Sequence, residues 1–397
     1  MEGHPAFFFA EYGHYIIEPQ ECKQKFTRPS LKYGGGGFTN SFRTDKIEVS
    51  CRKHRFPLPG TEIYSDNSPG RPPHRYKNRT VTIYESRGFA MYHIIINPAS
   101  RSGRGLRIWK RQIEPVLLKK SIPFQAYFSE KAGDTVHIVE TLTSRREDPV
   151  TLIIVGGDGT VNEALQGMKE PSRVTLGYIP TGSSNDLARD LKIPKNAPDA
   201  LDLILHTGNP HLMDIGCVVY PDGERRRFAV SCGLGFDAAV CQEALHSKIK
   251  NTMNRLHLGK LTYLGIALRQ LLAAKAVSGK LILENNAPID IPHMLFTACM
   301  IHRFEGGGFM FAPDADPHDG ILDLCAVGDL PKSLILFALP TAFWGKHYRF
   351  RGVTPYRTSS LTIETTLPLW VHTDGEVTRK SNRIHVTCEK NALHMIF

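Results

Sequence analysis

Strand-like and helix-like hydrophobic segments alternate along the chain from residue 91 to about residue 215. Four short, uniformly apolar runs predict buried strands, at 92–96, 122–128, 152–155 and 174–179. Three segments between them repeat apolar residues at helical spacing, at 106–117, 134–142 and 160–168. Such alternation is typical of a parallel sheet with helices on both faces. We therefore expect residues 91–215 to form a doubly wound α/β domain.

The pattern changes beyond about residue 215. Short apolar strands alternate with turns, at 227–231, 280–284, 294–300 and 321–327, and helical stretches are expected at 236–250 and 258–276. This favours a mostly antiparallel β-sandwich over residues 216–397. The last predicted strands either complete this sandwich or return to the first domain, and they lie at 361–364, 369–372 and 383–388.

Residues 1–90 show little hydrophobic periodicity. They contain four consecutive glycines at 34–37, a basic cluster at 52–55 and a proline-rich stretch at 57–73. We expect a disordered or loosely ordered leader. Two alternatives remain open, namely a basic membrane-binding arm or translation that begins at Met91.

Charge and composition narrow the function classes. The formal net charge of +10 favours an acidic partner such as a nucleotide or an anionic membrane surface. Aromatic residues are not interleaved with basic ones, so nucleic acid is not an expected partner. The eight cysteines include no Cys-x-x-Cys pair, and no apolar run approaches the roughly 20 residues of a membrane span. The apolar segment 334–344, followed by four basic residues, predicts either a membrane contact or a core helix.

The strongest local motif is Gly-Gly-Asp-Gly-Thr-Val-Asn-Glu at 156–163, which follows a buried strand and opens a helix. Glycines let backbone N–H groups approach phosphates, and the start of a helix adds partial positive charge. Asp158 would repel a phosphate directly, so it suggests a Mg²⁺ ion between the carboxylate and the phosphates. The alternative is a tight turn in which Asp158 is an ordinary turn residue.

Two further polar loops follow the first and fourth predicted strands, at 97–103 and 181–189. Each could simply cap the next helix. Parallel strands, however, bring their carboxyl ends to one edge of a sheet, where ligands of such folds bind. The three loops together therefore predict a nucleotide site.

These motifs, in this order, resemble the diacylglycerol kinase catalytic-domain family, which includes bacterial soluble lipid kinases, sphingosine kinases and ceramide kinases. Further matching segments lie at 235–238, 306–309, 313–315, 319–323, 345–347 and 374–376. The resemblance covers 91–397 and none of 1–90. It implies transfer of the γ-phosphoryl group of ATP to a lipid hydroxyl, first of all diacylglycerol to phosphatidic acid. Another lipid, such as a sphingoid base or phosphatidylglycerol, remains open, as do a NAD kinase-like enzyme and an inactive regulator.

The resemblance also implies a set of site residues, with ATP and Mg²⁺ in the cleft between the two domains. The ATP-binding residues would be Asn97, Ser102, Gly103, Ser129, Gly156, Gly157, Asp158, Gly159, Thr160, Val161, Asn162 and Ser183.

The resemblance assigns roles to four carboxylates. Asp158 and Asp214 would join a water network around the catalytic Mg²⁺, and either Asp374 or Glu376 would accept the proton of the attacking hydroxyl. The Asp-Gly pair at 374–375 is equally a strong hairpin signal.

A second Mg²⁺ site is implied in the acidic loop at 316–321. Its ligands would be the Asp319 carboxylate and the backbone carbonyls of Asp316 and Ile321. A solvated acidic loop is the alternative. The expected partners are a lipid in the membrane and an anionic membrane surface, met peripherally from the cytoplasm. A homodimer remains open.

Overall fold

The computed structural model describes residues 91–144, 149–246, 269–271, 273–284 and 286–397. The expectations for the leader at 1–90, and for most of the helix at 258–276, lie outside the described residues. All of the described residues belong to one compact unit.

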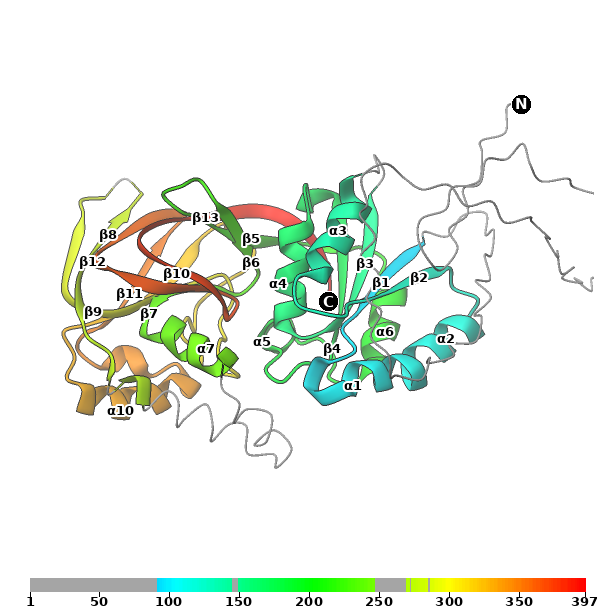
Figure 1. Ribbon diagram of the computed structural model, residues 1–397, viewed down its shortest axis with the longest axis horizontal. Helices are drawn as coiled ribbons and strands as arrows, with labels where there is room; N and C mark the ends of the chain where they lie inside the picture. The colour runs from blue at the N-terminus through cyan, green and yellow to red at the C-terminus, as the bar shows by residue number, and fades with distance from the viewer. Residues whose placement is uncertain (1–90, 145–148, 247–268, 272, 285) are drawn as a thin grey trace, which may run out of the picture. The chain divides into compact units, whose positions relative to one another are not determined.

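Four parallel strands form the sheet of the N-terminal part. In space their order is β2 (Phe124–Phe128), β1 (Tyr92–Ile96), β3 (Val150–Gly156) and β4 (Val174–Pro180). Figure 1 shows α3 (Asp134–Ser144) and α4 (Asp158–Gly167) on one side of this sheet. On the other side lie α1 (Ser100–Ile108), the π-helical turn Trp109–Ile113, α2 (Glu114–Lys119) and α6 (Ala197–His206). The expected doubly wound α/β domain is confirmed.

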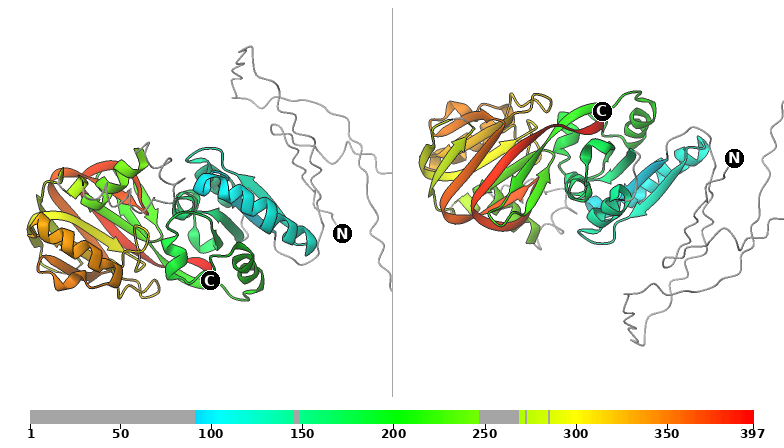
Figure 2. Two further views of the ribbon diagram at one scale, coloured as in Figure 1. Left: turned by 90° about the horizontal axis from the view of Figure 1, so that it is seen from below. Right: turned by 90° about the horizontal axis from the view of Figure 1, so that it is seen from above.

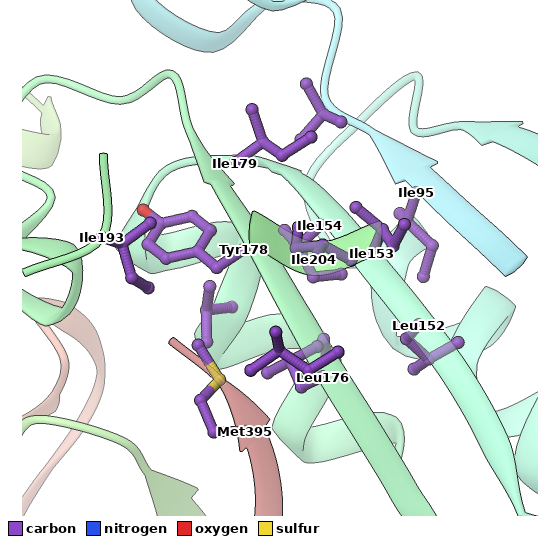
Figure 3. Close-up of a cluster of buried hydrophobic side chains, with 14 of the residues drawn as sticks. Ile95, Leu152, Ile153, Ile154, Leu176, Tyr178, Ile179, Ile193, Ile204 and Met395 are labelled. Atoms are coloured by element: carbon purple, nitrogen blue, oxygen red, sulfur yellow. The ribbon is translucent and has the colours of Figure 1, made fainter. Parts of the chain in front are cut away.

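The core of this domain lies between the sheet and its helices. Ile153 and Ile154 of β3 and Leu176 of β4 are fully buried, and Figure 3 shows them in one cluster with Met395 from the end of the chain. Strands covered on both faces carry apolar residues at successive positions, which explains the unbroken apolar runs in the sequence. Because both faces of the sheet are buried, its strands are fixed in position. The polar loops follow the ends of these strands.

The C-terminal part is antiparallel, as expected. Its strands are β5 (His211–Val219), β6 (Arg225–Phe228), β7 (Ser231–Gly235), β8 (Val277–Leu283), β9 (Ile289–Met300), β10 (Leu322–Gly328) and β11 (Val353–Thr358). The helices named among its described residues are α7 (Phe236–His246), α10 (Lys332–Thr341) and two 3₁₀ turns, Ala342–Trp344 and His347–Arg349. A short helix, α5 (Asp186–Asp190), precedes this part in the chain.

Two long strands replace the three short ones expected at the end of the chain. They are β12 (Ser360–Thr373) and β13 (Glu376–Ile396), joined by a two-residue turn. Their register shifts between Glu364 and Leu369, where residues of β12 are exposed. A bulge thus carries the strand across residues 365–368, where the sequence predicts a break between two short strands.

Strand β13 belongs to both parts of the fold. It pairs antiparallel with β12 and β5, and its end then pairs in parallel with β4, where His394 lies opposite Thr175. Figure 1 and Figure 2 show this strand, drawn in red, running from the antiparallel strands to the parallel sheet. Leu393 and Met395 are fully buried in the core of the α/β domain. One hydrogen-bonded strand therefore joins the two parts.

The expected apolar segment 334–344 forms α10 and the following 3₁₀ turn. Ile335, Ala338 and Ala342 are buried. Five large apolar side chains of the segment are instead exposed, and we call them the apolar rim: Leu334, Leu336, Phe337, Phe343 and Trp344. The segment therefore has a core face and a solvent face. None of the helices in the described ranges is long and apolar enough to cross a bilayer.

Candidate active site

An open pocket of about 420 Å³ lies at the carboxyl ends of the four parallel strands. Each of the four loops that follow these strands contributes to its wall. The residues that line it include Asn97, Ser129, Gly157, Gly159, Thr160, Gly182 and Glu376. The strand order reverses between β1 and β3, and α/β sheets bind ligands at such a point.

Side-chain hydrogen bonds hold the first of these loops against the others. The Asn97 side-chain amide donates to the Thr160 hydroxyl at 3.1 Å, and its carbonyl oxygen accepts from the Ala99 N–H at 3.1 Å. The Ser100 and Thr181 hydroxyls lie 2.7 Å apart. The loops after β1, β3 and β4 are thereby fixed relative to one another before any ligand binds.

Two glycines allow the loops after β3 and β4 to touch through their backbones. A Cβ atom on Gly182 would lie 2.6 Å from the Gly157 Cα, and one on Gly157 would lie 3.1 Å from the Gly182 Cα. Any side chain at 182 would force the loops apart. The pocket wall is consequently backbone at the start of α4, where N–H groups favour a phosphate.

The pocket brings together only part of the ATP-binding set that the sequence predicts. Asn97, Ser129, Gly157, Gly159 and Thr160 line it. Ser102 and Ser183 are exposed and Gly156, Val161 and Asn162 are buried, while Gly103 is half-buried with a φ of 86°. None of these six lines the pocket, and Asp158 does not line it either. Among the lining residues that sequence reasoning missed, Lys131 follows Ser129 in the same loop, which was the available signal.

Asp158 turns its carboxylate toward the loop after β4. One oxygen accepts the Asp186 N–H at 2.9 Å, and the other accepts the Tyr178 hydroxyl at 3.4 Å. Burial, and then the nearby charge of Asp186, raise the pKa of Asp158 to about 7. These hydrogen-bond partners include no cationic side chain, so the carboxylate could gain from a cation.

The Asp374–Gly375 turn separates two carboxylates with different surroundings. The Asp374 carboxylate accepts four hydrogen bonds, from the N–H groups of Ala229, Val230 and Ser231 and from the Asn162 amide, at 2.8–3.0 Å. Two bonds on each oxygen use the acceptor capacity of the group. Asp374 and Gly375 both have positive φ, 52° and 83°, as a type I′ hairpin turn requires.

Glu376, two residues later, lines the pocket. Its carboxylate lies over the start of α4, since a Cβ on Gly159 would be 2.8 Å from Glu376 Oε1. The structure thus points one carboxylate of the turn into the protein and the other at the glycine-rich loop.

Asp214 and Asp158 lie at opposite ends of the strands. The neighbouring Met213 pairs with Leu393, which lies beside the first residue of β4. Asp158, by contrast, lies just beyond Pro180, the last residue of β4. Six residues separate these levels, about 20 Å at 3.3 Å per residue. The carboxylate instead accepts the N–H groups of Gly320 and Asn391, each at 2.6 Å. The structure therefore does not bring Asp214 into a network with Asp158.

Cationic side chains contact the loop at which the second metal was expected. Arg357 binds the Asp319 carboxylate at 2.5 Å, and Lys390 donates to the Asp319 carbonyl at 3.2 Å. The Asp316 carboxylate accepts the His318 N–H at 3.1 Å, and Ile321 donates its N–H to Asp319. Mg²⁺ binding by Asp316, Asp319 and Ile321 stays a prediction, and the ion would compete with Arg357 for the Asp319 carboxylate.

Two acidic residues of α5, which sequence reasoning did not single out, connect the two parts of the fold. Asp186 accepts the Gly307 N–H at 2.7 Å. Asp190 binds His302 at 2.8 Å and the Arg303 guanidinium at 2.6 Å. Both lie in or beside the Asn-Asp-Leu-Ala-Arg motif, which was the signal in the sequence. They hold the segment 302–307 against α5, whose first residue also donates its N–H to Asp158.

Comparison with known proteins gives a consistent result from residue 91 to the end of the sequence. The family model "Diacylglycerol kinase catalytic domain" matches residues 91–218, and the model "YegS C-terminal NAD kinase beta sandwich-like domain" matches residues 230–397.

Individual relatives agree with these models. The chain is 27% identical to "Putative lipid kinase YtlR" of Bacillus subtilis (strain 168) over 296 residues, 72% of this chain and 93% of that protein. It is 28% identical to a diacylglycerol kinase of Staphylococcus aureus (strain JH9) over 287 residues, 71% of this chain and 85% of the other. A crystal structure of a diacylglycerol kinase from Bacillus anthracis str. Sterne superposes with a TM-score of 0.59 at 22% identity, covering 79% and 98% of the two chains. That structural likeness supports the fold.

Proposed function

Because the chain belongs to the diacylglycerol kinase catalytic domain family and is a lipid kinase, we propose that it transfers the γ-phosphoryl group of ATP to the hydroxyl of diacylglycerol. The product would be phosphatidic acid. The observation that carries this proposal is the position of Glu376, a carboxylate beside the glycine-rich pocket. A proton acceptor next to a phosphate-binding loop is what phosphoryl transfer to an alcohol needs.

In the proposed reaction the hydroxyl oxygen of the lipid forms a bond to the γ-phosphorus. The bond from that phosphorus to the bridging oxygen breaks, ADP leaves, and the hydroxyl proton passes to the Glu376 carboxylate. The four hydrogen bonds on Asp374 support this choice, because they leave that carboxylate without a free acceptor site. In this proposal Asp374 fixes the turn and Glu376 is the catalytic base.

Asp158 is the residue that we propose to hold Mg²⁺. A half-buried carboxylate whose pKa is raised to about 7 by burial favours a nearby cation. When bound, Mg²⁺ neutralises charge that develops on the phosphates. The N–H groups at the start of α4 would bind the phosphate oxygens, and the Asn97–Thr160 hydrogen bond would keep their loop in position.

The apolar rim defined above supports a lipid in a membrane as the substrate. Its side chains include Phe337 and Trp344, which are 70% and 68% exposed. The exposed Lys346, Arg349 and Arg351 follow directly in the chain. Apolar side chains next to basic ones fit an anionic bilayer surface, and each basic group near it contributes about 1 kcal/mol. We propose peripheral docking of this rim on such a surface.

The test is phosphorylation of a lipid panel with ATP labelled at the γ-phosphate. Diacylglycerol, a sphingoid base and phosphatidylglycerol would each be presented in mixed micelles, with NAD⁺ as a soluble acceptor. We expect label in phosphatidic acid, and none with the Glu376→Gln variant. Label in another lipid would change the substrate but keep the enzyme class, whereas label only in NADP⁺ would contradict the proposal.

A further inference from the structure

A buried histidine lies next to the turn that carries Glu376. His372 is the penultimate residue of β12 and has no exposed surface, and its Nδ1 accepts the Gly375 N–H at 3.2 Å. A backbone N–H can only donate, so Nδ1 is unprotonated and the proton of the neutral ring is on Nε2. The Gly375 peptide, directly before Glu376, is therefore fixed by an imidazole nitrogen.

Two carboxylates from distant segments lie at the other ring nitrogen. His372 Nε2 is 3.2 Å from Asp237 Oδ2 and 3.2 Å from Glu305 Oε1. Asp237 comes from the first turn of α7, and Glu305 from the segment between β9 and β10. Both carboxylates can only accept the Nε2 proton unless they are themselves protonated. They therefore select the tautomer that leaves Nδ1 free to accept from Gly375.

A glycine on the neighbouring strand makes room for this arrangement. His372 pairs with Gly233 of β7. A Cβ at Gly233 would lie 1.8 Å from Asp237 Oδ2 and 2.3 Å from His372 Nε2. No other residue could occupy this position while the three groups stay in contact.

The segment that carries Glu305 also reaches the opposite side of the site. Gly307, two residues later, donates its N–H to Asp186, whose own N–H binds Asp158. His372 thus joins the Glu376 turn, through Glu305, to the loop that holds Asp158. Burial raises the pKa of Asp237. Burial disfavours a charged His372 ring, but the charges of Glu305 and Cys241 outweigh it and raise the pKa of His372. The cluster therefore retains protons, and the Gly375 N–H at Nδ1 places them on Nε2 and on a carboxylate.

We propose that His372 is a positioning residue, held in its Nε2–H tautomer by Asp237 and Glu305, which fixes the Gly375 peptide and so aims the Glu376 carboxylate at the pocket. This inference rests on the proposed role of Glu376 in phosphoryl transfer. His372 acts through the turn and does not touch the substrate. The same three residues are also a possible set of metal ligands, and a bound metal would take the place of the Nε2 proton.

The first test reads the tautomer without using activity. The full chain, labelled with ¹⁵N-histidine, contains 17 histidines, and the His372 signals are those lost in His372→Gln. Two-bond ¹⁵N–¹H correlation spectra at about pH 6 and about pH 8 should show a neutral ring protonated at Nε2. An imidazolium, a ring protonated at Nδ1, or a metal-bound Nε2 that changes on chelation would overturn the proposal.

The second test separates the two ring nitrogens with a matched pair of variants. In His372→Asn the side-chain oxygen stands near the former Nδ1 and can still accept from Gly375. In His372→Gln the amide reaches toward the carboxylates but leaves Gly375 without that acceptor. We expect the Gln variant to lose kcat by about tenfold or more at nearly constant KM for ATP, and the Asn variant to lose about threefold or less.

Thermal unfolding of both variants identifies losses of kcat that come from misfolding. Asp237→Asn changes a residue that holds the tautomer and should also lower kcat. Equal losses of kcat in folded Asn and Gln variants, or a loss expressed mainly in the KM for ATP, would contradict the positioning role. If the wild-type chain phosphorylates no lipid of the panel, the proposed function fails, and the NMR result still decides whether His372 holds the turn.

Discussion

At the residue scale, Asp374 and Glu376 share one turn but should respond differently to amide substitution. Glu376→Gln removes the proton acceptor while its side chain keeps the same size, so kcat should fall by about 10²–10⁴-fold. The melting temperature should hardly change, because Glu376 is only half-buried at the pocket edge. Lipid phosphorylation and circular dichroism measure the two quantities.

Asp374→Asn should primarily destabilise the protein. The substitution turns one of the two carboxylate oxygens into an NH₂ group. That NH₂ group would face two N–H donors, either those of Asn162 and Ala229 or those of Val230 and Ser231. Buried donors without an acceptor cost about 1–3 kcal/mol. A normal melting temperature in Asp374→Asn, or a strong loss of stability in Glu376→Gln, would reverse the two assignments.

Asp158 should make stability depend on pH. Its pKa is about 7 in the folded chain, against an ordinary value of 3.8 for an aspartate. Between about pH 4 and about pH 7 the folded protein keeps a proton that the unfolded chain has lost, so stability falls as the pH rises through this window. Asp158→Asn should therefore melt higher than the wild type at about pH 8 and similarly at about pH 4, in the absence of nucleotide.

The same Asp158→Asn variant should lose kinase activity if the carboxylate holds Mg²⁺. A suitable control is Asp199→Asn, an exposed position on α6, which should change neither property. Activity above about a tenth of the wild type, a barrier change below about 1.4 kcal/mol, would argue against the role in Mg²⁺ binding.

At the scale of elements, α10 and its 3₁₀ turn would provide the proposed contact with a membrane. Phe337→Ala and Trp344→Ala should each weaken binding to anionic vesicles by about tenfold, since a large apolar side chain contributes about 1.5 kcal/mol or more when it leaves water. Binding should also fall as salt rises. Vesicle co-sedimentation at low and high salt measures both effects.

Matched controls lie elsewhere on the surface. Leu118 on α2 and Leu367 on β12 are 58% and 57% exposed, and their alanine variants should bind vesicles as the wild type does. Equal losses in rim and control variants would show that general hydrophobicity, rather than α10, governs the interaction.

Elements buried on both faces were predictable from the sequence, whereas a strand that continues through exposed residues was not. The parallel strands are largely apolar because helices cover both of their faces. Strand β12 instead continues through the exposed residues 366–368, and its pairing with β13 resumes at Leu369 after a bulge. Pro368 interrupts the strand pattern in the sequence, which therefore predicts two short strands, and only the partner strand extends the sheet.

The candidate site divides in a similar way. The loops that line its pocket carry local motifs, so the sequence alone could single them out. The choice between Asp374 and Glu376 depends on backbone N–H groups at 229–231, more than 140 positions earlier in the chain. The His372 cluster likewise joins three segments distant in sequence. Residue type and spacing could not reveal either arrangement.

At the scale of the whole molecule, β13 should make the α/β and antiparallel parts unfold together. Leu393→Ala removes a fully buried side chain from the α/β core and should cost about 2–5 kcal/mol. Because β13 also pairs with β12 and β5, the antiparallel part should lose stability equally.

The chain's three tryptophans allow this to be measured. Trp109 lies in the α/β core and Trp370 on β12. Single-tryptophan proteins that retain one or the other should give the same denaturation midpoint, and Leu393→Ala should shift both midpoints by the same amount. A shift confined to the Trp109 protein would show that the two parts unfold independently.

The Asp374–Gly375 turn also bears on how the protein ages. An aspartate followed by glycine is chemically prone to isomerise, because the next amide nitrogen can attack the side-chain carboxyl group and form a cyclic imide. That attack requires the carboxyl group to rotate away from its partners. Four hydrogen bonds restrain the Asp374 carboxylate. The Asp374–Gly375 peptide bond should therefore isomerise far more slowly in the folded protein than in an unfolded chain. The network that orients the turn would then also set the shelf life of the enzyme.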